Sequence, residues 1–208
     1  MPIVALGCYA AFVLVALVGR SLLARARTGD WGIRIAMATT PGARVAHALF
    51  VGGGLGIALG PALDLVGIGG GWSTRVSSPP DGTFGSPTVG IALAALGTAG
   101  TVWSQLVMGA SWRIGVDPDE RTALVARGPF RLVRNPIFTS MLLAAAGLVV
   151  LAPSVVGVVA LAILLAGLEL QVRGVEEPYL VAAHGSAYLG YAARTGRFLP
   201  GVGLLKAR

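Results

Sequence analysis

The sequence predicts an all-α integral membrane protein with five transmembrane helices, of which the last two form a tight hairpin. Of its 208 residues, 55% are hydrophobic and only 12% are charged, which is about half the charged fraction of an ordinary soluble domain. The mean hydropathy is +0.78, and long apolar runs separate the charged residues into blocks. One soluble domain of this length cannot bury so many apolar side chains, so lipid is the expected solvent.

The first three apolar runs are each long enough for one membrane helix. They carry few charges, and the first run ends at a cluster of arginines, which are typical flanks of a transmembrane helix. We expect these helices to make up an N-terminal region, residues 1–111. Their expected bounds are about 3–24, 43–68 and 87–109.

The fourth apolar run is too long for one helix. Residues 137–168 hold no charge, and as a single helix they would extend for about 48 Å, against a hydrocarbon core of roughly 30 Å. Pro153 and Ser154 lie at its midpoint, where proline removes a backbone donor and serine can cap a new helix. We therefore expect two short antiparallel helices, about 137–152 and 154–172, within a second region that covers residues 112–208.

The distribution of basic residues supports five helices. Fifteen of the 16 basic residues are arginine, and five basic residues fall in each of the blocks 20–44, 113–134 and 173–208. Five spans place all three blocks in the cytoplasm and the N-terminus outside, as the positive-inside rule requires. The blocks flank apolar runs rather than form one stacking surface, which argues against nucleic-acid binding. The high ratio of arginine to lysine favours the cell (inner) membrane of a prokaryote.

Polar residues outside the spans gather in two stretches, 112–138 and 169–200, which the five-helix topology places on the same side of the membrane. In the first stretch, Gly128-Pro129 indicates a turn and Asn135-Pro136 indicates the start of a helix. Asn135 has two possible roles there. It is either a plain N-cap or a residue that places its amide against a polar ligand.

The second stretch contains two adjacent acids, Glu176 and Glu177. Acids near bilayer depth are costly unless they are paired, and they are candidate functional residues. Glu169, Arg173 and Glu177 are each four residues apart, so a continuous helix would join them by modest ion pairs. A carboxylate also suits ribose hydroxyls or a cationic sulfonium.

These motifs together resemble one enzyme family. Gly-Pro-Phe-Arg-Leu-Val-Arg-Asn-Pro-Ile-Phe at 128–138 precedes the apolar hairpin, and Glu-Glu-x-x-Leu-x4-Gly-x-x-Tyr-x-x-Tyr at 176–191 leads to Arg-Phe-Leu-Pro at 197–200. Their order and spacing resemble the isoprenylcysteine carboxyl methyltransferase family and its prokaryotic relatives. The resemblance covers about residues 112–201.

The resemblance implies an integral membrane methyltransferase that uses S-adenosylmethionine, needs no metal ion, and takes a lipophilic acceptor from the surrounding membrane lipids. It implies that the cofactor lies on the cytoplasmic side and that Arg173 and Glu177 are catalytic. The residues implied for cofactor binding are Leu124, Val125, Phe130, Asn135, Ile137, Phe138, Glu176 and Glu177.

This chain departs from the family at two of these positions. Asn135 stands where the family usually has histidine, and Phe138 where it usually has tyrosine. Asparagine still donates and accepts hydrogen bonds. Phe138 has the aromatic ring of tyrosine but lacks the hydroxyl group, so it cannot form the hydrogen bond of that hydroxyl.

The sequence leaves the identity of the acceptor open. Arg173 would orient a carboxylate, while an amine or phenol would need Glu176 or Glu177 as a base. The alternative functions are phospholipid amine methylation, lipid reduction with NADPH, and a non-enzymatic role as a transporter or a membrane complex subunit.

Overall fold

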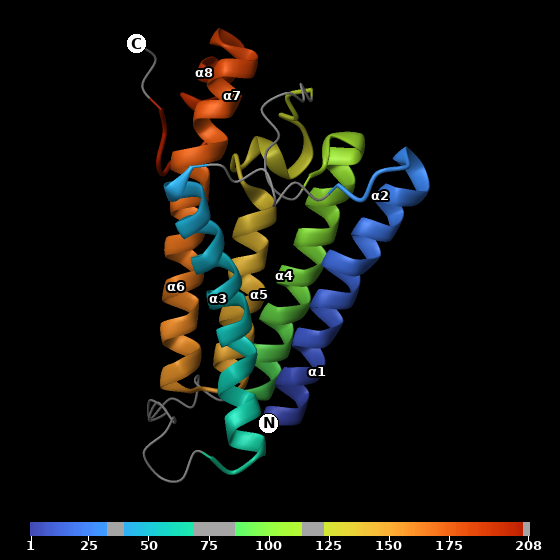
Figure 1. Cartoon of the computed structure of the whole chain (residues 1–208), viewed down its shortest axis with the longest axis vertical. Helices are drawn as coiled ribbons and strands as arrows, with labels where there is room; N and C mark the ends of the chain where they lie inside the picture. The colour runs from blue at the N-terminus through green and yellow to red at the C-terminus, as the bar shows by residue number, and fades with distance from the viewer. Residues whose placement is uncertain (33–39, 69–85, 114–122, 206–208) are drawn as a thin grey trace.

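The computed structural model describes residues 1–32, 40–68, 86–113 and 123–205. Within these residues the protein is all-helical and contains no strand, and five apolar helical rods run up and down in one bundle (Figure 1). Four of the rods are long and apolar enough to cross a membrane, and one is shorter. The predicted fold class is therefore confirmed. The rods are the continuous helix α1 (Pro2–Phe12), η1 (Val13–Gly19) and α2 (Arg20–Thr28), followed by α3 (Pro41–Leu65), α4 (Pro87–Met108), α5 (Pro136–Leu151) and α6 (Val155–Gln171).

The predicted hairpin between α5 and α6 is present, but its arms are unequal. The Ser154 hydroxyl accepts a hydrogen bond from the amide of Gly157, at 2.9 Å, and so caps α6 as expected. The first arm has 16 residues, or about 24 Å at 1.5 Å per residue. The second arm, α6, ends at Gln171, close to the expected end near residue 172. The helix does not stop there, however, but continues through η5 (Val172–Glu176) and α7 (Glu177–His184). The first backbone break after α6 is Gly185, with φ +54.

Glycines allow the long rods to pack in two close pairs, α3 with α6 and α4 with α5. A Cβ atom on Gly53 would lie 2.5 Å from the backbone nitrogen of Leu164, and one on Gly90 would lie 2.7 Å from the Cβ of Leu151. Such close approach replaces the hydrophobic drive that lipid does not supply. Gly52, by contrast, meets nothing within 4 Å.

Buried polar contacts attach the first rod to α4. The Gln105 amide donates to the Ala16 carbonyl at 2.9 Å, inside the π-helical segment η1. Arg20 donates to the Gly109 carbonyl at 2.7 Å, and its guanidinium lies 4.4 Å from the ring centroid of Trp112. These contacts fix the C-terminal ends of the two rods side by side.

The segments that carry the described arginines of all three basic blocks meet at one end of the bundle, opposite the N-terminus (Figure 1). The end of the first rod, the start of α3, the end of α4, the start of α5 and the segments after α6 all meet there. This arrangement agrees with the predicted five-helix topology. Arg34, Arg75, Arg121, Lys206 and Arg208 lie outside the described residues.

The close pairing of α3 and α6 can be tested with two neighbouring glycines. We expect Gly53→Ala to lower the free energy of unfolding by roughly 1–3 kcal/mol, because its methyl group has no room against Leu164. Gly52→Ala should leave stability unchanged or raise it by up to about 1 kcal/mol, since alanine favours a helix. Denaturant unfolding in detergent micelles measures both variants, and equal effects would contradict the glycine contact.

Candidate functional site

The polar stretch before α5 and the tail after α7 meet at the end of the bundle that carries the arginines. The short 3-10 helix η4 (Gly128–Arg131) leads into an extended stretch that lies parallel to the tail after α8 (Ser186–Ala192). The amide of Arg134 donates to the Gly196 carbonyl at 2.7 Å, and that of Asn135 to the Arg197 carbonyl at 3.1 Å. The two motif segments of the sequence therefore form one structure.

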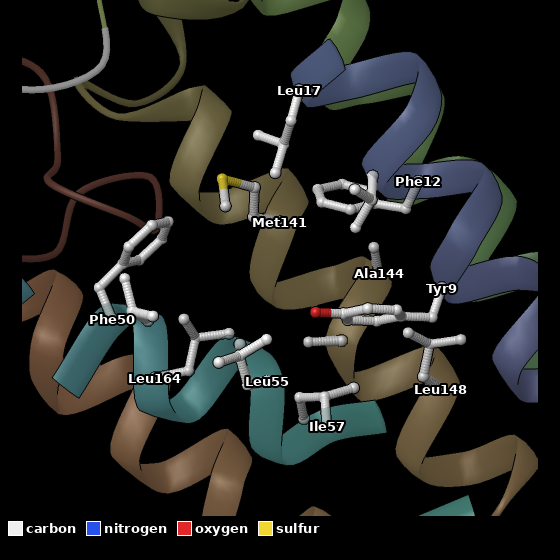
Figure 2. Close-up of a pocket in the computed structure, with 14 residues that line it drawn as sticks. Tyr9, Phe12, Leu17, Phe50, Leu55, Ile57, Met141, Ala144, Leu148 and Leu164 are labelled. Carbon is white, nitrogen blue, oxygen red and sulfur yellow. The ribbon is translucent and has the colours of Figure 1, made fainter. Parts of the chain in front are cut away.

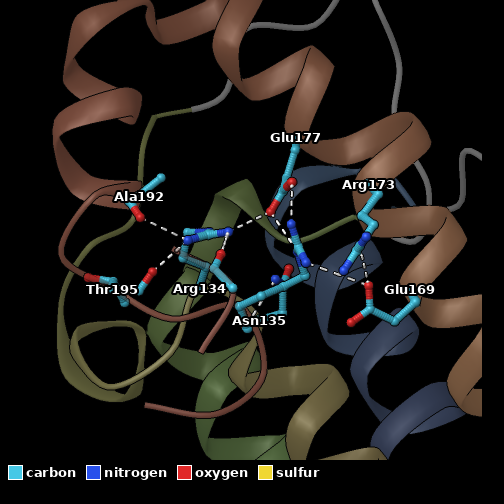
Figure 3. Close-up of polar contacts among 9 residues, drawn as sticks. Arg134, Asn135, Glu169, Arg173, Glu177, Ala192 and Thr195 are labelled. Carbon is cyan, nitrogen blue, oxygen red and sulfur yellow. Dashed lines mark hydrogen bonds and ion pairs between the residues drawn. The ribbon is translucent and has the colours of Figure 1, made fainter. Parts of the chain in front are cut away.

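Glu177 lies at the centre of a buried ion cluster that joins these segments (Figure 3). Arg134 Nη2 donates to Glu177 Oε1 at 2.6 Å. Arg197 Nε donates to the same oxygen at 2.8 Å, and Arg197 Nη2 donates to Oε2 at 3.0 Å. The three side chains are at most 9% exposed. Both carboxylate oxygens are thus engaged by guanidinium groups.

Arg134 also holds the backbone of the tail. Its Nη1 donates to the carbonyls of Ala192, at 3.0 Å, and Thr195, at 2.5 Å, and its Nη2 donates to that of Gly203, at 2.9 Å. One side chain therefore fixes three positions of a segment that has little secondary structure of its own.

Glu169 forms the ion pair that the helical spacing predicts with Arg173, at 2.6 Å, but Arg173 does not pair with Glu177. The reason is the π-helical segment η5, which adds a residue to the turn between them. One extra residue rotates the rest of the helix by about 100° relative to a regular helix. Pro178 comes directly after Glu177, and its ring would clash with the carbonyl of Gly174 in a regular helix, so the wider turn accommodates it. Glu177 consequently turns inward, while the Arg173 side chain stays 64% exposed.

The tail beyond the spans is further fixed by protonated groups. Hydrogen bonding to Glu177 raises the pKa of Arg197 above its usual value. Burial raises the pKa of Tyr191 to about 12, so its hydroxyl keeps its proton and donates to the Phe130 carbonyl at 2.6 Å. Both contacts persist over the whole physiological pH range.

Asn135 is not a side-chain N-cap of α5, although α5 begins at Pro136 as predicted. Its carboxamide nitrogen donates to the Arg197 carbonyl at 3.2 Å instead. The first of its two expected roles is therefore wrong. The carboxamide is half-buried at the junction of the two motif segments.

The other expected cofactor residues are buried to different extents. Phe130 is buried, and Ile137 is half-buried in the first turn of α5. Phe138 is half-buried and packs, like Phe198, against the apolar core of the bundle. Leu124 and Val125 are half-buried in the stretch before η4.

The backbone of residues 123–126 and the side chain of Glu176 differ from the rest of the site in the polar contacts that they form within the described chain. No backbone hydrogen bond joins residues 123–126 to other described residues. This stretch contains Leu124 and Val125, which the resemblance assigns to the cofactor. Glu176 forms no ion pair within the described chain, in contrast to Glu177.

Arg134, Arg197 and Tyr191 hold the segments of the candidate site together, although the sequence alone assigned no role to them. All three stand inside the quoted motifs, and the need to pair a buried acid was the available signal. The spacing along the sequence did not say which arginines would supply the charge, because both partners of Glu177 come from distant segments.

Part of this region matches a known family, and the whole fold is similar to a solved structure. Residues 86–187 match the model of the phospholipid methyltransferase family. No curated protein matches the chain by sequence. Among solved structures, the fold is similar to that of the eukaryotic intramembrane Ras methyltransferase ICMT (isoprenylcysteine carboxyl methyltransferase), with a TM-score of 0.58 and 16% sequence identity, over 99% of this chain and 69% of that one.

The family model that residues 86–187 match and the solved structure with the similar fold both describe methyltransferases. In particular, the chain is similar to ICMT, as its motifs predicted. The family match begins at the start of α4 and extends through α5, α6 and α7 into α8, so it includes Arg134 and Glu177.

The ion cluster predicts a large difference between two glutamates. Glu177→Gln should lower the free energy of unfolding by roughly 3–5 kcal/mol, because it leaves two buried guanidinium groups without a counter-charge. Glu169→Gln should cost less than about 1 kcal/mol, since that side chain is 34% exposed and its main partner is exposed. Denaturant unfolding in the same detergent measures both. Similar losses in the two variants would contradict a central role of Glu177.

Proposed function

We propose that this protein is an S-adenosylmethionine-dependent methyltransferase that methylates a lipophilic acceptor taken from the bilayer. The observation that carries the proposal is the junction of the two motif segments at one end of the bundle, fixed by Arg134, Glu177 and Arg197 within and next to the matched methyltransferase region. The arginine distribution favours the cytoplasmic face of a cell membrane for this end.

The residues at the junction fit the chemistry of the cofactor. The backbone of residues 123–126, which forms no hydrogen bond to the backbone of other described residues, offers donors and acceptors to an adenine or ribose. Phe130 and Phe138 offer aromatic surface. Glu176 offers a carboxylate without an arginine partner in the described chain and suits the ribose hydroxyls or the positive sulfonium. When bound, S-adenosylmethionine supplies an electrophilic methyl group.

Glu177 then acts in a supporting role. Both of its oxygens already accept hydrogen bonds from arginines, and a carboxylate held in this way is a weak base. We therefore assign direct contact with the cofactor to Glu176. Glu177 positions the tail through Arg134 and Arg197.

Arg173 is the candidate for orienting the acceptor. Its side chain is exposed beside the cluster, and Glu169 holds its Nε at 2.6 Å, which leaves its terminal nitrogens available to a carboxylate. Methyl transfer from a sulfonium is a one-step displacement. The chain therefore has to align the acceptor atom and exclude water, and a carboxylate acceptor needs no base.

Phospholipid amine methylation is the second candidate, and the name of the matched family favours it. An amine acceptor must lose a proton, so this reaction would use Glu176 as a base rather than Arg173 as an anchor. The two candidates share the cofactor and differ in the acceptor.

The cofactor can be tested by thermal stabilisation. We expect S-adenosylhomocysteine, but not NADPH, to raise the melting temperature of the purified protein. Glu176→Gln should weaken S-adenosylhomocysteine binding by roughly tenfold, because it removes one charge-assisted hydrogen bond. Glu169→Gln is the matched control and should bind normally. Stabilisation by NADPH alone would reject the methyltransferase proposal, and unchanged affinity in Glu176→Gln would exclude that acid from the cofactor site.

The acceptor can be tested with a membrane lipid extract and deuteromethyl-labelled S-adenosylmethionine. Mass spectrometry should show label in a lipophilic product. Arg173→Ala should reduce turnover by at least about tenfold with little change in cofactor affinity, since a lost charge-assisted contact to the acceptor is worth about 1.5–3 kcal/mol. Arg194→Ala, another exposed arginine at this end, serves as the control. Full turnover in Arg173→Ala would point to an amine acceptor.

A further inference from the structure

The bundle contains an apolar cavity of about 190 Å³ between the first rod, α3, α5 and α6 (Figure 2). Its walls are almost entirely carbon. Residues of the π-helical segment η1 take part in the lining, where the first rod departs from regular helical geometry. The lining includes Phe12, Leu17, Phe50, Met141, Ala144 and Leu148.

One polar group faces this apolar space. The ring of Tyr9 lies beside Ala144 and Leu148, and its hydroxyl points into the space between the rods (Figure 2). This hydroxyl has no hydrogen-bond partner among the described residues. A hydroxyl group in hydrocarbon without a hydrogen-bond partner is unfavourable by several kcal/mol. An oxygen atom of a bound ligand that accepted a hydrogen bond from Tyr9 would remove this cost.

The cavity is continuous with the lipid-facing surface of the bundle. Val51 and Leu55 of α3 line it and are also 40% and 63% exposed. A chain dissolved in the bilayer can therefore enter between α3 and the first rod without crossing water.

The cavity also approaches the candidate site. Phe138 lies one turn before Met141 on α5, and Phe138 and Tyr9 pack against the same apolar core. From Asn135 at the start of α5 to Ala144 the helix rises by about 14 Å. An acceptor with its head group at the junction thus has its chain beside Tyr9.

We propose that this cavity holds the apolar chain of the methyl acceptor and that the Tyr9 hydroxyl donates a hydrogen bond to an oxygen within that chain. The inference rests on the proposed function and narrows its substrate class to lipids with a hydroxyl, ether or carbonyl group along the chain. The volume is below the roughly 300–1,000 Å³ of sites that enclose a whole drug-sized ligand, so the cavity takes a segment of the chain while the rest stays in lipid.

The test compares two probes, octadecanoate and 12-hydroxyoctadecanoate, that bind to the full-length protein in phosphatidylcholine nanodiscs with S-adenosylhomocysteine present. The wild-type protein should bind the hydroxylated probe about tenfold more tightly, because one additional hydrogen bond to the Tyr9 hydroxyl changes the affinity by about this factor. Tyr9→Phe should abolish that preference and leave the affinity for octadecanoate unchanged.

Two glycines of α3 provide a matched pair for the cavity itself. Gly54 lines the cavity and Gly52 does not, and a Cβ atom on either meets nothing within 4 Å. Gly54→Leu should weaken both probes at least about fivefold, because its side chain fills the space that a lipid chain would occupy. Gly52→Leu should weaken neither.

Three outcomes overturn the inference. They are equal binding of both probes by the wild-type protein, a preference that survives in Tyr9→Phe, and equal binding by the two glycine variants. Thermal stabilisation by S-adenosylhomocysteine is measured on the same nanodiscs. Its loss would refute the proposed function, whereas its presence without chain discrimination would refute only the role of the cavity.

Discussion

The carboxylate of Glu177 is the interaction on which the candidate site depends. It lies inside the protein with Arg134 and Arg197, and such charges are tolerated only when each is paired and hydrogen-bonded. Arg134 meets this condition largely through carbonyls of the tail, from Ala192 to Gly203. The stretch before α5, the start of α7 and the tail are therefore held as one unit. None of the three can move without leaving a charge unpaired.

The bundle below supplies a rigid base for this unit. Glycines bring α3 against α6 and α4 against α5 at backbone distance, and two of these rods, α5 and α6, continue directly into the ion cluster. The first rod is attached differently, through Gln105 and Arg20 at its C-terminal end. The apolar cavity lies along this rod, where close glycine contacts are replaced by larger side chains such as Phe12 and Tyr9. Tight packing thus positions the polar site, and looser packing leaves space for a chain.

Much of the architecture can be predicted from local chemistry. Pro153 and Ser154 indicated the hairpin, because a missing donor and a capping hydroxyl act within a few residues. The turn of Glu177 into the protein depends instead on the π-helical segment before Pro178, and helical periodicity assumes a regular helix. Its partners Arg134 and Arg197 were present in the motifs, but a contact between distant segments requires the folded chain. The contact face of α3 likewise includes Gly53 rather than Gly52, a difference of one residue that composition does not resolve.

The dependence of Arg134 on the tail also sets an order of events during biosynthesis. A ribosome makes Arg134 and Glu177 before it makes Thr195, Arg197 and Gly203, which are their later partners. All five rods can therefore enter the bilayer while the cluster still lacks a cation and several acceptors, with its charged groups hydrated at the membrane surface. The ion cluster can therefore be completed only after translation has passed Gly203.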